Sequence, residues 1–218
     1  MSTIRNFTPQ ISIILTVFNR ADIFTRALNS IINQSFTDYE IIIINDGSTD
    51  DFHGKIIHYL KYDYRIKYYF HSNSGTVASL NKGINIAEGR YITFLDSDDE
   101  YKSNHLESRI NYMNYNPEVD LIHSDSLLIG EEADFWIPDA QNPGKLIHVN
   151  DCIIGATFFG KKEVFKEKFV EVYSYDSEFI QRISGKYKIR KISNPTYIYY
   201  RNSSDGILNR LKNIRKND

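Results

Sequence analysis

Two almost uninterrupted apolar runs, ISIILTVFN at 11–19 and YEIIIIND at 39–46, point to the fold class of this chain. Both are rich in β-branched residues, and their lack of polar alternation predicts strands that are buried on both faces. Apolar residues at helical spacing between Phe24 and Ile32 predict a helix that ends near Gln34. A strand, a helix and a second buried strand in this order predict a parallel βαβ unit.

The alternation continues along the first half of the chain. Further strands are predicted at 65–70, 91–96 and 119–125, and helical stretches separate them. The helix before Pro117 is expected to be capped by Ser103. Strands and helices that alternate across short loops predict an α/β fold with an open, mostly parallel sheet, whose ligands bind outside the carboxyl ends of the strands.

The second half is less regular. Residues 127–150 contain the only tryptophan, Trp136, and either a functional loop on the acceptor side or a solvated insertion explains them. With nearby tyrosines, Trp136 is a candidate for stacking on a sugar ring, although packing in the core is the alternative. Further on, 156–169 predicts a short strand and then a basic helix, 174–183 a helix, and 196–202 an aromatic strand.

Composition excludes several classes of protein. The chain has 218 residues with 41% hydrophobic content, enough for one sizeable core, and a net charge of -2 without the basic patch of a nucleic-acid-binding protein. Cys152 is the only cysteine, so an internal disulfide is impossible and a reducing cytoplasm is expected. No apolar run approaches the ~20 residues of a membrane span. Lys161, Lys162, Lys166 and Lys168 suggest either peripheral contact with the inner face of the cell membrane or a solvated basic face.

Polar residues fall at or just past the ends of the first four predicted strands: Asn19, Asp46, Asn73 and Asp96. The carboxyl ends of parallel strands share one edge of a sheet, so these side chains are expected to converge. The chain has no G-x-x-x-x-G-K-[ST] motif and no G-x-G-x-x-G after the first strand, so neither kind of glycine-rich phosphate cradle is present.

The acidic stretch FLDSDDEY at 94–101 places Asp96, Asp98 and Asp99 within four positions. Unpaired carboxylates so close would raise one another's pKa, and a shared cation would relieve this. Oxygen ligands favour Mg²⁺ or Mn²⁺, which commonly bridge a carboxylate to substrate phosphates. An acidic turn that caps the next helix explains the same residues, so both interpretations stay open at this point.

Five ordered motifs carry a resemblance to a known family: TVFNR at 16–20, INDGSTD at 44–50, NSGTVASLNKGI at 73–84, FLDSDDEY at 94–101 and YDSEF at 175–179. Together they resemble the family 2 glycosyltransferases of the GT-A fold, over roughly residues 10–205. The resemblance implies one Rossmann-like GT-A domain over 1–218. Its nucleotide-sugar-binding half would cover about 10–125, its acceptor-binding half about 126–205, and a polar tail 206–218.

The resemblance also implies the residues of a donor site. Asp98 would be the metal ligand of a DxD motif, with Mn²⁺ or Mg²⁺ as the cofactor. The residues expected around the nucleotide-sugar are Thr16, Phe18, Asn19, Asp46, Ser48, Asn73, Gly75, Asp96, Ser97 and Arg201. The resemblance implies transfer of a sugar, with inversion, from a nucleotide-sugar to a hydroxyl of a saccharide or lipid-linked saccharide. A UDP-sugar is favoured as the donor because it is common in the family.

The catalytic base is expected in the YDSEF motif. Asp176 matches the family's catalytic carboxylate, Tyr175 replaces the acid that often precedes it, and Glu178 is the second candidate. Caps for the following helix would explain both acids equally. The chain also has Leu80 where the family often has arginine, and no histidine follows Arg201. These departures keep two alternatives open, a nucleotide-sugar-binding protein without turnover and, less favoured, a sugar nucleotidyltransferase.

Overall fold

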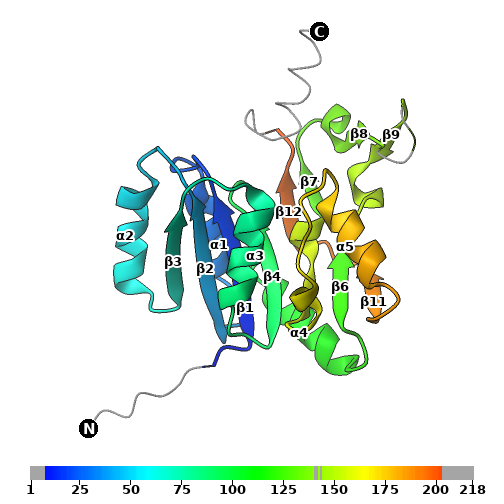
Figure 1. Ribbon diagram of the computed structural model, residues 1–218, viewed down its shortest axis with the longest axis horizontal. Helices are drawn as coiled ribbons and strands as arrows, with labels where there is room; N and C mark the ends of the chain where they lie inside the picture. The colour runs from blue at the N-terminus through cyan, green and yellow to red at the C-terminus, as the bar shows by residue number, and fades with distance from the viewer. Residues whose placement is uncertain (1–7, 140–141, 143, 203–218) are drawn as a thin grey trace.

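The structure is a computed structural model that describes residues 8–139, 142 and 144–202, so the predicted polar tail lies outside the described residues. The first half alternates strands and helices as predicted (Figure 1). Its elements are β1 (Ile11–Val17), α1 (Phe24–Ile32), β2 (Tyr39–Asp46), α2 (Phe52–Tyr62), β3 (Ile66–His71), α3 (Thr76–Ile86), β4 (Tyr91–Asp96), β5 (Glu100–Tyr101), α4 (His105–Tyr115) and β6 (Leu121–Ser124).

Short elements dominate the second half, where sequence patterns are weaker. They are β7 (Leu127–Ile129), η1 (Glu132–Phe135), β8 (Trp136–Pro138), β9 (Leu146–His148), η2 (Val149–Asp151), η3 (Gly155–Thr157), β10 (Phe159–Lys161), η4 (Val164–Glu167), α5 (Tyr175–Ile183), β11 (Ile189–Ile192) and β12 (Tyr197–Tyr200). The region from 127 to 150 is therefore built of short strands and 3-10 turns.

The central sheet is mostly parallel, which confirms the predicted fold class. Within the described residues it has seven strands in the order β11-β6-β10-β4-β1-β2-β3. Strand β10 runs antiparallel to both of its neighbours, β4 and β6, while the other pairs are parallel. A smaller sheet, β5-β12-β7, connects the loop after β4 to the end of the described chain.

Both faces of the sheet are covered by helices, and this explains the uninterrupted apolar runs. Successive residues of β1 point to opposite faces: Ile13 and Leu15 pack with α1 and α4, and Ile14 packs with α3. Helix α5 shares the face of α3 through Phe179, and these two helices lie in front of the sheet in Figure 1. Both sets of side chains are removed from water, so a strand here needs no polar face.

Two local predictions are wrong. Helix α4 begins at His105 with Asn104 as its N-cap and no side-chain cap, so Ser103 lies one residue before the capping position, where its carbonyl accepts a hydrogen bond from the Ser35 backbone N–H, 2.8 Å away. The predicted basic helix within 156–169 is a single 3-10 turn, η4, and Lys168, the residue that follows it, has a positive φ of 55°. That left-handed conformation stops a helix from continuing.

Candidate active site

The loops after β1 and β2 form one continuous surface at the carboxyl edge of the sheet. Asn19 has a φ of 51°, and its backbone N–H donates to Ser48 Oγ over 3.0 Å. Its side-chain Oδ1 accepts from the Thr49 backbone N–H over 2.8 Å. Phe18, beside Asn19, is 40% exposed. The structure therefore brings together three of the predicted nucleotide residues, with an aromatic ring at the surface.

Asp46 joins the ends of β2 and β3. Its two carboxylate oxygens accept from the backbone N–H groups of Ser74, over 2.7 Å, and Gly75, over 3.0 Å, while Asn73 Nδ2 donates to the Asp46 carbonyl over 3.1 Å. Gly47 has a φ of 77°, and a Cβ there would lie 2.6 Å from Asn73 N, so only glycine fits this approach. Asp46, Asn73 and Gly75 thus lie together, and the two carboxylate oxygens would have to share their remaining lone pairs with any bound base.

The acidic stretch after β4 divides into residues with different surroundings. Asp99 is buried, and it accepts from Tyr197 Oη over 2.6 Å and from the Tyr200 backbone N–H over 2.8 Å. These bonds tie the loop to β12. Asp98 Oδ2 lies 3.9 Å from Arg20 Nη2, and the Arg26 guanidinium donates to the Asp98 carbonyl. Asp99 is therefore a structural anchor, whereas the Asp98 carboxylate remains at the partly exposed edge.

Asp96 lies where β4 ends, opposite Thr16 of β1, and Ser97 after it is buried. The pKa of Asp96 is raised to about 7, mainly by burial and in addition by the Asp98 and Asp176 carboxylates, while Arg20 opposes the rise. Carboxylates raise one another's pKa only when they lie close together. The structure thus brings the acidic stretch of β4 and the first turn of α5 to one place.

The two candidate bases have opposite environments. Asp176 is at the start of α5, where Oδ2 accepts from Gly155 N over 3.1 Å and Oδ1 from Ser177 N over 2.8 Å. Burial raises its pKa in spite of these bonds. Glu178 instead forms an ion pair of 2.6 Å with Arg182, and this hydrogen bond lowers its pKa. Of these two candidates, only Asp176 has the raised proton affinity that is typical of a carboxyl group in an active site.

Arg182 also has a structural role. Its guanidinium donates to the carbonyl groups of Glu167, over 2.9 Å, and Lys168, over 2.8 Å, which holds α5 against the loop after η4. Tyr175, in place of the family's usual acid, packs edge-on against Phe169 with ring centroids 5.3 Å apart. Glu178 and Tyr175 therefore serve the packing of α5 in this structure.

Arg201, which the resemblance places near the nucleotide-sugar, is buried in this structure. Its Nε donates to the Asp134 carbonyl over 2.9 Å, and its Nη1 to Tyr199 Oη over 3.2 Å. Contact with a phosphate would require the side chain to give up these bonds. In this structure Arg201 attaches η1 to β12.

The carboxylate oxygens of this site suit a divalent cation that completes its coordination with oxygen atoms of a bound substrate. Among the described residues no three His, Cys, Asp or Glu side chains converge into a complete metal site. Asp96 and Asp98 nevertheless supply hard oxygen atoms in a region of crowded negative charge. Mg²⁺ and Mn²⁺ are commonly held by one or two carboxylates together with substrate phosphates, so these residues fit the predicted metal.

Two residues that hold the loops around the site in place have contacts that sequence motifs do not reveal. Arg26 donates to the carbonyl of Asp98, 72 positions away, and its guanidinium lies 3.6 Å from the centre of the Tyr200 ring. Asn81 exchanges hydrogen bonds of 2.8 and 2.9 Å with the Phe169 backbone, 88 positions away. No local pattern reports contacts between such distant positions. The only signal was the position of Asn81 within the third motif.

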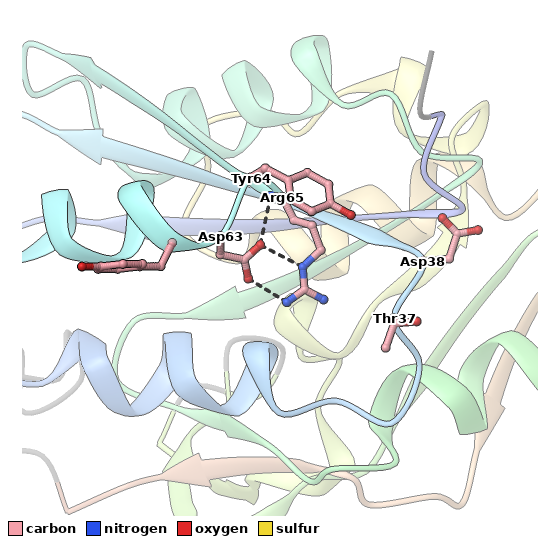
Figure 2. Close-up of a pocket in the computed structure, with 6 residues that line it drawn as sticks. Thr37, Asp38, Asp63, Tyr64 and Arg65 are labelled. Atoms are coloured by element: carbon pink, nitrogen blue, oxygen red, sulfur yellow. Dashed lines mark hydrogen bonds and ion pairs between the residues drawn. The ribbon is translucent and has the colours of Figure 1, made fainter. Parts of the chain in front are cut away.

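A separate cleft lies at the opposite edge of the sheet. Figure 2 shows Thr37 and Asp38, which precede β2, near Asp63, Tyr64 and Arg65, which precede β3. Its volume is about 460 Å³, and Arg65 forms a two-pronged ion pair with Asp63 at 2.6 and 2.9 Å. Ligands of parallel α/β sheets bind beyond the carboxyl ends, so this cleft at the amino ends is no candidate for the active site.

Comparison with known proteins identifies the fold and the family. Over 92% of this chain and 60% of the other, the structure matches S. aureus TarS 1–349 in complex with UDP-GlcNAc, with a TM-score of 0.72 at 19% identity. It also matches the mannosyltransferase PcManGT from Pyrobaculum calidifontis in complex with GDP-Man and Mn²⁺, with a TM-score of 0.71 at 15% identity over 96% and 65% of the two chains. The architecture is thus that of the GT-A-type glycosyltransferases.

The sequence specifies the family within this class. Residues 12–167 match the model of glycosyl transferase family 2. The chain is 38% identical over 109 residues, 50% of its length, to the putative teichuronic acid biosynthesis glycosyltransferase TuaG of Bacillus subtilis, covering 43% of that protein. This chain belongs to glycosyl transferase family 2, and it spans less than half the length of the first curated relatives it matches.

Proposed function

We propose that this chain is a glycosyltransferase domain that moves a sugar from a nucleotide-sugar to an acceptor hydroxyl with inversion at the anomeric carbon. The observation that carries this proposal is the grouping of Asp96, Asp98 and Asp176 at the carboxyl edge of the sheet. The loops that hold Asn19, Ser48 and Asp46 share this edge. Such a transfer needs acidic side chains that can bind a cation and a carboxyl group that can accept the proton of the acceptor hydroxyl, and this site offers both.

The donor half of the proposed site is the surface formed by the loops after β1 to β4. Phe18 offers an exposed ring to a base, while Asn19 and Ser48 order the loop beneath it. Asp98 would hold Mn²⁺ or Mg²⁺, with Asp96 beside it toward the ribose. When bound, the ion would supply positive charge that stabilises the diphosphate leaving group. The structure of PcManGT in complex with GDP-Man and Mn²⁺ supports the choice of metal.

Asp176 is the proposed base on the acceptor side. The N–H groups of Gly155 and Ser177 fix the orientation of its carboxylate. Burial raises its pKa, which brings its proton affinity closer to the pH at which enzymes work. Glu178 remains the second candidate, but it would first have to leave Arg182.

The substrates are proposed at the level of chemical class. UDP-sugars are favoured because TarS was crystallised with UDP-GlcNAc, and a GDP-sugar is the alternative that PcManGT suggests. The name of TuaG, which places it in teichuronic acid biosynthesis, supports a saccharide acceptor in polysaccharide synthesis. The proposed acceptor is a free or a lipid-linked saccharide. The structure describes no helix that is long and apolar enough to cross a membrane among residues 8–139, 142 and 144–202.

A donor panel tests the proposed function. UDP-, GDP- and dTDP-sugars would be screened with Mn²⁺ by thermal shift, because a ligand that binds the native state raises its apparent stability. Products would then be analysed for the best ligand. A free nucleoside diphosphate with a glycosylated acceptor supports the proposal, whereas pyrophosphate would indicate a nucleotidyltransferase.

A protein that binds nucleotide-sugars without turnover is the second candidate. The observation that favours it is the loss of the family's usual acid at Tyr175, together with the ion pair that engages Glu178. These leave Asp176 as the only candidate base in this motif. Tight nucleotide-sugar binding without turnover on any saccharide acceptor would support this alternative.

A further inference from the structure

The hairpin of β8 and β9 presents an apolar face to solvent. Trp136 pairs with His148, and Pro138 pairs with Leu146, so these four side chains share one face, while the Ile137–Ile147 pair lies on the other. Trp136 is 41% exposed and Leu146 is 62% exposed. Large side chains at this exposure incur a hydrophobic cost, so a contiguous face of them indicates a binding surface. We call these four residues the Trp136 face.

His148 fixes the tryptophan ring and adds a polar group beside it. The two rings meet edge to face at 78°, with centroids 5.4 Å apart. His148 Nδ1 accepts from the Asn150 backbone N–H over 3.2 Å, so in the neutral ring the proton is on Nε2, which is then a hydrogen-bond donor. An aromatic plane with an adjacent donor suits a ligand that has both C–H surfaces and hydroxyl groups.

Both ends of the hairpin are held in place. On the entry side, Arg201 Nε donates to the Asp134 carbonyl, two residues before Trp136. On the exit side, Asn150 donates to the Ser126 carbonyl over 3.0 Å and accepts from the Ser126 N–H over 2.9 Å. The Trp136 face therefore needs little ordering when a ligand binds, which favours affinity.

The hairpin lies on the side of the proposed base. The Asp176 and Asp139 carboxylates, with Asp151, add to the effect of burial in raising the pKa of Cys152, so the end of β8 and the start of α5 are both close to this thiol. Gly155, three residues on, donates to Asp176. Figure 1 shows β8 and β9 beyond the end of β6, at the same end of the molecule as the carboxyl ends of β1 and β4.

The charge around the Trp136 face limits which kinds of ligand can bind there. The Trp136 face contains no permanently charged side chain, and the sequence that flanks it has an excess of negative charge: the acids Glu131, Glu132, Asp134 and Asp139 against the single base Lys145. An anionic membrane or a nucleic acid would meet repulsion here. A neutral sugar ring would not, and its apolar C–H face matches the indole in size.

We propose that the Trp136 face is an acceptor subsite, in which Trp136 stacks on one neutral pyranose ring of the saccharide and His148 hydrogen-bonds a ring hydroxyl. This inference rests on the proposed function and names the acceptor class of the same site. The ring bound here would lie beyond the one whose hydroxyl reaches Asp176, so the subsite selects acceptors of two or more sugar units.

Because Trp136 is the only tryptophan of the chain, its fluorescence reports on this surface alone. The full chain with Mn²⁺ and UDP would be titrated with neutral methyl glycosides and with their di- to tetrasaccharides, while iodide quenching is measured. We expect disaccharides and longer saccharides to shift the emission to shorter wavelength and to reduce quenching severalfold, with little effect from monosaccharides.

Quenching that no saccharide changes, although UDP binds, would overturn the proposal. Protection that depends on protein concentration alone would assign the face to a second copy and overturn it equally.

Variants separate this inference from the proposed function. Trp136→Ala should raise the acceptor KM about tenfold, equivalent to about 1.4 kcal/mol, with the rate of donor hydrolysis by water unchanged. Trp136→Phe, which keeps an aromatic plane, should recover most of the loss. Tyr115→Ala is the matched control, because Tyr115 is 86% exposed at the end of α4.

Unchanged acceptor KM in Trp136→Ala would refute the subsite and leave the proposed function standing. Absence of any donor turnover in the wild type would refute the proposed function itself.

Discussion

At the scale of single residues, the acidic stretch after β4 shows how neighbouring carboxylates acquire different tasks. Asp99 is engaged with Tyr197 and with the backbone of Tyr200, so it holds the loop in place. Asp96 and Asp98 remain at the edge, with Arg20 as the cation near both. The resemblance assigned Asp96 and Asp98 to the donor site, but only the contacts with β12 reveal the structural role of Asp99.

Asp98→Asn tests the metal assignment. Removing one anionic oxygen ligand should abolish the part of UDP binding that depends on Mn²⁺ and leave weak, metal-independent binding. Thermal shift measures this directly, since a ligand at about 100 times its Kd stabilises the native state by about 2.7 kcal/mol. Glu131→Gln, which alters an exposed acid, serves as the control. An Asp98→Asn variant with an undiminished Mn²⁺-dependent shift would show that the ligand is elsewhere.

The pKa of Asp176 predicts how turnover varies with pH. A base must be deprotonated, and burial raises the pKa of Asp176 above the 3.8 of an exposed aspartate. Turnover should therefore fall on acidification at a higher pH than an ordinary aspartate would allow, and rise to a plateau as pH increases through the raised value. The pH profile of kcat measures this effect.

Substitution tests the same residue. Asp176→Asn should lower kcat by about 10²- to 10⁴-fold, the usual contribution of a general base, and should remove the acid limb of the profile. Glu178→Gln should retain near-normal turnover, because Glu178 is bound to Arg182. The reverse ranking of the two variants would move the base to Glu178.

At the scale of elements, helix α4 depends on a buried polar network. His105 stacks on Tyr101 with ring centroids 3.7 Å apart, accepts from Arg109 Nε over 3.0 Å, and contacts Thr196 Oγ1 at 3.0 Å. Arg109 is fully buried and donates to Ser124 Oγ over 2.8 Å. Burial, and then the neighbouring Arg109, hold the pKa of His105 well below 6.5. The network thus requires a neutral imidazole.

This network predicts lower stability in acid. The unfolded chain binds a proton at His105 below about pH 6.5, whereas the folded chain does not, so the free energy of unfolding should fall as pH drops below that value. Urea unfolding at several pH values measures the slope, and His105→Gln should reduce it by up to about 1.4 kcal/mol per pH unit. If that variant does not fold, NMR of the wild type should show a neutral His105 ring throughout this pH range. A ring that protonates near 6.5 would contradict the account.

The elements that sequence patterns predicted are those with strong periodicity. Strands β1 to β4, β6 and β12 and helices α1, α3, α4 and α5 were all predicted near their observed positions. Strand β11 was missed because Arg190 and Lys191 are exposed on it, so no apolar run marks it. Strands β7, β8 and β9 have three residues each, too few for a period to show.

At the scale of the whole molecule, the order of the sheet explains where the site lies. The insertion of β10 between β4 and β6 joins the parallel first half to the second half, which carries Asp176. The sequence predicted the edge at which Asn19, Asp46, Asn73 and Asp96 meet, because parallel strands share their carboxyl ends. Partners such as Gly155 and Arg26 could not be predicted, since their contacts depend on how the two halves pack.

The location of the proposed metal and nucleotide can be measured in one experiment. Mn²⁺ is paramagnetic and broadens the NMR signals of nearby groups, so a spectrum of the full chain with UDP and Mn²⁺, compared with UDP and Mg²⁺, maps the ion. The account predicts broadening at Asp98 and its neighbours, at Asn19 and Ser48, and at Gly155 and Asp176, with Thr37, Asp38 and Arg65 at the opposite edge unaffected. Broadening centred on the cleft at the amino ends of β2 and β3, with sharp signals around Asp98, would contradict it.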